Sequence, residues 1–165
     1  MNKGRYESQA LLDERALLTC MAYVDLNPIR AALTKTLQGS DYTSVQARIS
    51  ATRGEPSPLP LVPFQDQPEA TDDALSYYLR HYLELVDWTG RAVRDDKRGA
   101  IPPDIESVLE TLGFDEATWL EGIKLYGRPI FKVIGPSDRM RTVARTHRQS
   151  WYRGLSACHA VFGPT

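Results

Sequence analysis

Tyr23 and Asn27 stand one helical turn apart in the stretch MAYVDLNPIRAAL, and Pro28 follows directly. A tyrosine hydroxyl can attack a DNA phosphate and hold the strand as a phosphotyrosine ester. Since the pKa of a phenol is about 10, a divalent cation normally polarises the phosphate for such an attack. The Asn27 carboxamide is an oxygen ligand that suits such a hard cation. The spacing is therefore compatible with a nucleophile and a metal ligand on one flank of a helix.

The same residues also fit an ordinary helix end. Pro28 has no amide hydrogen and suits the first position of a new helical turn, with Asn27 as its N-cap. The chain holds eight tyrosines, so a tyrosine one turn before an asparagine is not in itself a nuclease signature. From these residues alone, the catalytic and the structural interpretation both stay open.

A second group of candidate residues lies near the C-terminus. Arginine forks match the geometry of phosphates, and aromatic rings can stack on unpaired bases. The candidates for DNA contact crowd one short helical region: Arg139, Arg141, Arg145, Arg148, Arg153 and Trp151. The alternative is a solvated helix face whose Trp151, Leu155 and Phe162 belong to the core. The region lacks the balancing acids of a merely solvated face, which favours DNA contact.

Charge is distributed unevenly along the chain. The net charge is −1, yet residues 124–165 hold eight Lys and Arg and one acid, a net +7, which leaves −8 for residues 1–123. A local excess of positive charge is typical of a surface that binds a polyanion. No apolar run is long enough to span a membrane and no secretory signal is evident, while two distant cysteines suggest a reducing compartment. We therefore expect a cytoplasmic protein without a membrane partner.

Apolar spacing places the candidate residues on helices. A helix is expected over residues 13–26, with Tyr23 on the flank of one apolar stripe: Leu17, Cys20, Met21 and Val24. Short helices are expected over residues 28–33 and in SDYTSVQARI, the latter started by Ser40 or Asp41. Further helices are expected after the prolines: one capped by Thr71, then residues 104–112, residues 115–126 capped by Asp115, one from Ser137, and SWYRGLSACHAVF.

Five prolines between residues 51 and 70 predict an extended linker, since proline continues neither helices nor central strands. The sequence therefore predicts a mostly α-helical protein in three parts. Residues 1–50 form short N-terminal helices, residues 51–70 form the Pro-rich linker, and residues 71–165 form a small helical domain with a basic face. His81, His147 and His159 are too scattered for a recognisable metal-binding pair.

The stretch GRYESQALLDERALLTCMAYVDLNPIRAAL, with the later SDYTSVQARI, resembles the REP-associated tyrosine transposases of the single-tyrosine HUH nuclease superfamily. The nuclease helix of that family carries a Tyr-x-x-x-Asn-Pro signature, followed by a small basic segment like Arg30–Ala31. The resemblance implies that Tyr23 attacks DNA, that Asn27 assists a Mg²⁺ or Mn²⁺ ion, and that Arg30 contacts single-stranded or hairpin DNA. It also implies that residues 1–50 are the remnant of an αβ nuclease domain.

One departure from the family is serious. Its two metal-binding histidines precede the tyrosine helix, and this chain contains no His-hydrophobe-His. The chain resembles the C-terminal half of a transposase, so we expect it to bind no cation and to cleave no strand unless a missing N-terminal half supplies the histidines. The alternative is a small helical interaction protein, without DNA function, in which Leu17, Met21 and Val24 pack against a partner or a second copy.

Overall fold

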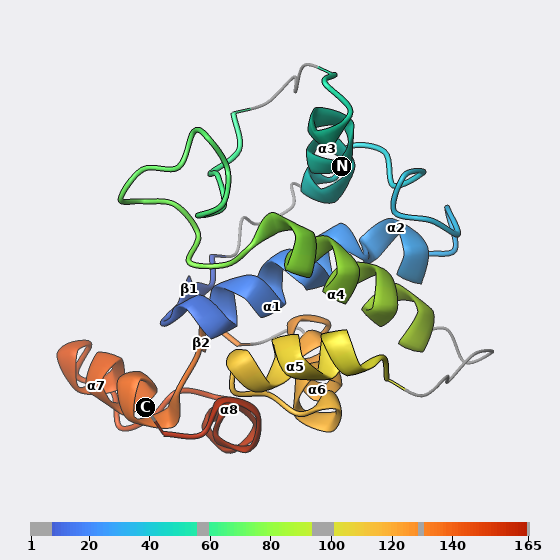
Figure 1. The fold of residues 1–165 in the computed structure, drawn as a ribbon. Helices are drawn as coiled ribbons and strands as arrows, with labels where there is room; N and C mark the ends of the chain where they lie inside the picture. The colour runs from blue at the N-terminus through green and yellow to red at the C-terminus, as the bar shows by residue number, and fades with distance from the viewer. Residues whose placement is uncertain (1–7, 56–59, 94–100, 129–130, 165) are drawn as a thin grey trace, which may run out of the picture. The chain divides into compact units, whose positions relative to one another are not determined.

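The computed structural model describes residues 8–55, 60–93, 101–128 and 131–164, and this part of the chain is mostly α-helical, as the sequence predicts (Figure 1). Its elements in chain order are β1 (Ala10–Leu11), α1 (Glu14–Asp25), α2 (Asn27–Arg30), α3 (Ser44–Thr52), α4 (Leu79–Ala92), α5 (Pro103–Thr111), α6 (Glu116–Tyr126), β2 (Val133–Ile134), α7 (Ser137–Thr146) and α8 (Leu155–Phe162). Within the described residues, no helix is long and apolar enough to cross a bilayer.

The contacts divide the chain into two compact units. The first unit comprises Met1–Cys20 and Ala117–Thr165, and the second comprises Met21–Glu116. The division does not fall in the Pro-rich segment, whose described residues, 51–55 and 60–70, belong to the second unit. Residues 56–59 of that segment lie outside the described residues.

The described remainder of the Pro-rich segment is packed. Phe64 is fully buried, its ring centroid lies 5.2 Å from that of Tyr82, and the Arg48 guanidinium lies 4.6 Å from the centre of the Phe64 ring. Arg48 also donates to the Val62 carbonyl at 3.0 Å. Burying a phenylalanine contributes roughly 1.5–3 kcal/mol, which offsets part of the cost of ordering the chain around it. An apolar anchor thus holds a segment whose composition is typical of a linker.

Helix α4 begins at Leu79 and not at Thr71, so the expected cap is wrong. Before the helix, Leu75 forms an isolated parallel β-bridge with Phe64. The Leu75 amide donates to the Pro63 carbonyl at 2.9 Å. The first turn of α4 is capped from a distance, because the Asp66 carboxylate accepts the Leu79 amide at 2.9 Å. Local propensity at Thr71 is overridden by this non-local pairing.

The apolar stripe expected on α1 is not the buried face of the helix. Val24 is 51% exposed, whereas the fully buried positions include Ala16, Thr19, Ala22 and Asp25. Thr19 donates its hydroxyl hydrogen to the Arg15 carbonyl at 2.7 Å, so its burial leaves no hydroxyl unsatisfied. Two polar residues therefore occupy the buried face, which a count of apolar residues could not reveal.

The Asp25 carboxylate joins three helices of the second unit. It accepts hydrogen bonds from the Ser44 hydroxyl at 2.9 and 3.0 Å, the Val45 amide at 3.1 Å and the Tyr82 hydroxyl at 2.6 Å. Asp25 ends α1, Ser44 and Val45 begin α3, and Tyr82 lies in α4. Helix α3 is also capped by Thr43, which accepts the Gln46 amide at 3.3 Å, and not by the expected Ser40 or Asp41.

The first unit is built around buried side chains of α1 and α6. The Tyr126 hydroxyl donates to the Ala16 carbonyl at 2.5 Å, and burial raises the pKa of this phenol. Trp119 is fully buried, and Arg15 donates to the Phe162 carbonyl at 3.0 Å. Two short parallel strands pair Ala10 with Val133, while α7 and α8 pack on each other. These contacts position the C-terminal arginines.

Removal of the Tyr82 hydroxyl tests the role of Asp25. We expect Tyr82→Phe to lower the free energy of unfolding by about 1–3 kcal/mol, because a buried carboxylate loses one of its donors. The measurement is urea denaturation followed by circular dichroism. Tyr78→Phe is the matched control, since Tyr78 is half exposed just before α4 and should lose less than about 0.5 kcal/mol. Equal losses in the two variants would contradict the assigned role.

Candidate nucleic-acid interface

The junction between α1 and α2 carries the residues expected to do chemistry. The backbone stays helical through the junction, because the Leu26 amide donates to the Ala22 carbonyl at 3.0 Å and the Arg30 amide to the Leu26 carbonyl at 2.9 Å. The N-cap position of α2 is Leu26, and no side chain caps this helix. Asn27 is the first residue of α2 and is exposed, so its expected role as the cap is wrong.

Tyr23, Asn27 and Arg30 share one flank of this nearly continuous helix, since they follow each other at helical spacing. The Arg30 guanidinium carbon lies 4.4 Å from the centre of the Tyr23 ring, in cation–π geometry. Tyr23 is half buried, and Asn27 and Arg30 are exposed. The structure thus brings Arg30 onto Tyr23 and leaves the Asn27 carboxamide accessible to a ligand.

The surroundings of Tyr23 do not supply a metal site among the described residues. No group of three or more His, Cys, Asp and Glu side chains that could hold an ion occurs in that part of the chain. Asp25, the acid nearest in sequence, is fully buried and accepts the hydrogen bonds of Ser44, Val45 and Tyr82. The donor set that a divalent cation requires is therefore not met by Asn27 and the described residues.

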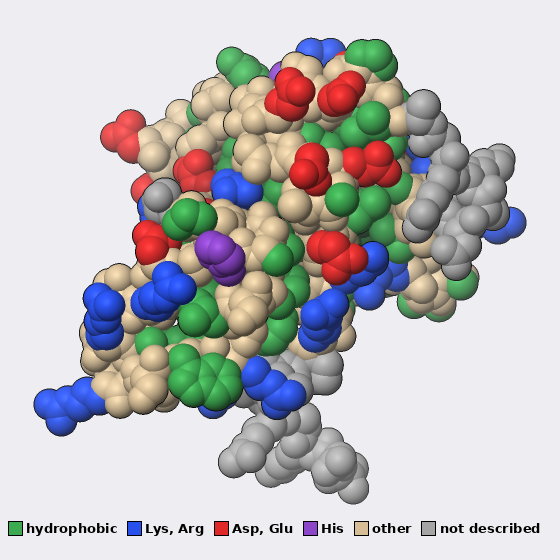
Figure 2. Space-filling model, turned by 90° about the horizontal axis from the view of Figure 1, so that it is seen from below, with side chains coloured by type: hydrophobic (Ala, Val, Ile, Leu, Met, Phe, Trp, Pro, Cys, Tyr) green, Lys and Arg blue, Asp and Glu red, His purple; other side chains and the backbone are tan. Residues whose placement is uncertain are grey.

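The C-terminal arginines lie on the outer face of α7 and just beyond it. Met140 and Ala144 are buried, and four exposed arginines lie around this buried stripe and just after the helix: Arg139, Arg141, Arg145 and Arg148, here named the α7 arginine surface. Arg139 donates to the Leu12 carbonyl at 2.7 Å. Among the described residues, no acid forms an ion pair with the other three. In the lower part of Figure 2, Lys and Arg side chains lie beside hydrophobic ones without an acidic side chain among them.

Trp151 and Arg153 follow the α7 arginine surface in the chain, and both are exposed. Trp151 is 63% exposed, whereas Phe162 is 1% exposed and Leu155 is half buried. Of the three residues that the alternative interpretation assigns to the core, Phe162 lies there and Trp151 does not. An exposed indole beside arginines is available for stacking on a base.

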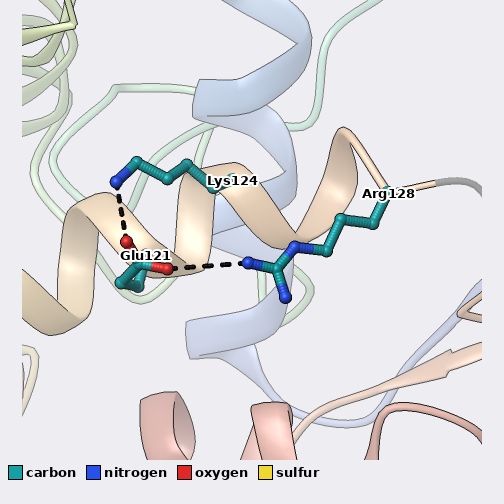
Figure 3. A network of polar contacts seen from close by, with 3 residues as sticks. All are labelled: Glu121, Lys124 and Arg128. Carbon is teal, nitrogen blue, oxygen red and sulfur yellow. Dashed lines mark hydrogen bonds and ion pairs between the residues drawn. The ribbon is translucent and has the colours of Figure 1, made fainter.

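The sequence analysis did not single out Arg128, which also lies at this end of the first unit. Glu121 on α6 accepts a hydrogen bond from Lys124 at 2.6 Å and forms a longer ion pair with Arg128 at 3.8 Å (Figure 3). The hydrogen bond from Lys124 is the main reason why the pKa of Glu121 is lowered. Glu121 is therefore engaged mainly with Lys124. The signal that could have found Arg128 is its place in the basic C-terminal part of the chain.

Comparison with protein families, with characterised proteins and with solved structures found no match for this chain. The candidate residues must therefore be interpreted from their own geometry and chemistry.

Alanine substitution distinguishes a ligand-facing Asn27 from a capping one. We expect Asn27→Ala to change the free energy of unfolding by less than about 0.5 kcal/mol, because Asn27 caps no helix. Thr43→Ala is the matched comparison and should cost about 0.5–2 kcal/mol, since Thr43 caps α3. Urea denaturation measures both values. A loss at Asn27 as large as that at Thr43 would show that Asn27 has a structural role.

Proposed function

We propose that this chain is a transposase-related protein that binds single-stranded or hairpin DNA in the cytoplasm, and that it corresponds to the C-terminal part of a REP-associated tyrosine transposase. The observation that carries DNA binding is the α7 arginine surface, in which Arg141, Arg145 and Arg148 have no acidic partner among the described residues. Such a cluster repels itself unless a polyanion neutralises it. Arginine also matches the geometry of phosphate oxygens.

The proposal also covers the helix flank that carries Tyr23, Asn27 and Arg30. Residues 1–50 are proposed to be the remnant of the nuclease domain, with Tyr23 corresponding to the DNA-attacking residue. Two observations support this assignment: the accessible carboxamide of Asn27, and the Arg30 guanidinium beside the phenol ring, which places a positive charge where a phosphate would approach. Because the chain has no His-hydrophobe-His and the described residues lack the donor set for a cation, strand cleavage is assigned to a complex with a chain that supplies histidines.

A different class of function rests on another observation. Val24 is 51% exposed on α1, and Leu17 and Met21 are half buried. This partly exposed apolar face favours a second candidate, a protein-interaction module or homodimer without DNA function. Sedimentation distinguishes the candidates, because a monomer that binds hairpin DNA in a salt-dependent way contradicts the second.

Salt-dependent binding tests the main proposal. We expect the triple variant Arg141→Gln, Arg145→Gln, Arg148→Gln to bind a fluorescent hairpin at least about tenfold more weakly at low salt. The slope of log Kd against log salt concentration should fall by about one for each lost phosphate contact. Fluorescence anisotropy measures both quantities.

The matched control removes arginines from another surface. Arg80 and Arg91 on α4 are exposed, and each pairs with an acid one turn away, Glu84 and Asp87 respectively. The double variant Arg80→Gln, Arg91→Gln should bind DNA within about twofold of the wild type, since charges that are already paired contribute little to phosphate binding. An equal loss in the triple variant and in this control would contradict a localised DNA-binding surface.

A nicking assay tests the proposed role of Tyr23. We expect the purified chain to leave hairpin DNA uncut in Mg²⁺ or Mn²⁺, because attack by a phenol needs a phosphate polarised by a bound cation, and the described residues lack the donor set to hold one. The assay is denaturing electrophoresis of end-labelled hairpin, with Tyr23→Phe as the matched variant. Robust cleavage by the wild type that is lost in Tyr23→Phe would show that this chain forms a complete site.

A further inference from the structure

The first unit contains a cavity of about 630 Å³ that none of the preceding assignments uses as a whole. We name it the Trp151 pocket. Its lining residues come from the segment after α6 and from the start of α8: Arg128, Phe131, Trp151, Arg153, Gly154, Leu155, Ser156 and Ala157. The volume lies within the range of roughly 300–1,000 Å³ that is typical of small-ligand sites.

The charge of the Trp151 pocket is positive. Arg128 and Arg153 both line it and both are exposed, and no acidic side chain is among the described residues that line it. Among the described residues Arg153 has no ion-pair partner, and Arg128 has only the 3.8 Å contact with Glu121, which is already hydrogen-bonded to Lys124. Two arginine forks that line one cavity without a close carboxylate are suited to the oxygens of a phosphate.

The start of α8 adds backbone donors to the same cavity. Gly154 is the N-cap of α8, and no side chain caps the helix. The Leu155 amide donates to the Tyr152 carbonyl at 3.4 Å, so among the described residues the Ser156 and Ala157 amides of the first turn are left for a ligand. The positive end of a helix dipole favours an anion at this position. Gly154 has a φ of 95°, and a Cβ there would overlap the Phe131 ring, so the chain tolerates no larger residue at this point.

The aromatic wall of the pocket is accessible. Trp151 is 63% exposed, whereas Trp119 in the same unit is fully buried. Phe131, beneath Gly154, is buried and gives the cavity a fixed apolar floor. A planar ring that stacks on the indole would cover apolar surface that is otherwise in water.

We propose that the Trp151 pocket binds one nucleotide unit of single-stranded DNA, with the phosphate held by Arg128, Arg153 and the Ser156 and Ala157 amides, and the base stacked on Trp151. The inference rests on the proposed DNA binding and extends it, since it names a site separate from the α7 arginine surface. Two arginines, free helix amides and an exposed indole lie in one cavity, and their combined chemistry fits a phosphate attached to a planar base. Neither a simple inorganic anion nor an apolar ligand uses all of these groups.

Fluorescence of the full chain tests the inference without a substitution. Trp151 is the accessible tryptophan, because Trp88 is 6% and Trp119 is 0% exposed. We expect an eight-nucleotide single-stranded oligodeoxythymidine to quench the emission and to protect it at least about twofold from acrylamide. Free thymidine monophosphate should require at least about tenfold higher concentration, because it fills the pocket but cannot also contact the α7 arginine surface. An oligonucleotide that binds without protecting the emission would overturn the inference.

Variants separate the phosphate contact from the base contact. We expect Arg128→Gln with Arg153→Gln, and separately Trp151→Ala, to weaken oligonucleotide binding about tenfold by anisotropy. Trp151→Phe should keep binding within about threefold while the fluorescence change disappears, since a phenyl ring still stacks. The charge-matched control is Arg80→Gln with Arg91→Gln, expected to bind within about twofold. All these positions are exposed, and circular dichroism checks that each variant folds.

The possible outcomes distinguish this inference from the proposed function. DNA binding that depends on the α7 arginine surface but is unchanged in the pocket variants would overturn the inference and leave the proposed function standing. Absence of DNA binding by the wild type would overturn both. Equal affinity for thymidine monophosphate and the oligonucleotide, lost in the arginine variant, would assign the pocket to a free nucleotide and overturn its assignment to DNA.

Discussion

The buried carboxylate of Asp25 is the interaction on which the second unit depends. An ionised group away from water is costly unless donors satisfy it, and here Ser44, Val45 and Tyr82 supply them. These donors come from α3 and α4, so satisfying one charge fixes the end of α1 against two other helices. Asp25 lies two residues from both Tyr23 and Asn27, which places it on the opposite side of the helix. A hydrogen-bonded carboxylate on the inner face thus supports an outer flank on which Asn27 and Arg30 are exposed.

The first unit shows the converse arrangement. Its interior contains contacts such as the Tyr126 hydroxyl on the Ala16 carbonyl and the half-buried Arg15 on the Phe162 carbonyl, and its C-terminal arginines are exposed. The α7 arginine surface has almost no acids to balance it, so its charges favour a polyanion over a compact neutral surface. The Trp151 pocket combines positive charge with a defined shape. Phe131 lies directly against Gly154, and a side chain at residue 154 would displace the Phe131 ring from the floor of the pocket. Each unit therefore carries its own candidate site: the Trp151 pocket and the α7 arginine surface in the first unit, and the flank with Tyr23 and Asn27 in the second.

Much of the helical content followed from local patterns in the sequence. The starts of α5, α6 and α7 lie within one residue of the expected Asp104, Asp115 and Ser137, because Asp and Ser are local signals for a helix start. Most of the α7 arginine surface was also evident, since a run of arginines without acids must be largely solvated whatever the fold. The exposure of Trp151 was not evident, because a tryptophan near Phe162 fits a core equally well.

Local patterns in the sequence indicated most of the helical segments, where the positive charge gathers and that Tyr23 and Asn27 share a flank, because these properties depend on residues within a few positions of one another. Tertiary structure alone decided that Thr19 and Asp25 lie on the buried face of α1, that α4 begins at Leu79 and that Arg128 joins Trp151 and Arg153 around one cavity. In the cases of Asp25 and Leu79 the deciding partner is remote in the chain: Tyr82 for the first, Asp66 for the second. A polar group can be buried, and a helix can begin, where a partner forms the hydrogen bond that the group or the helix start needs. Whether a remote partner is close enough depends on the tertiary structure.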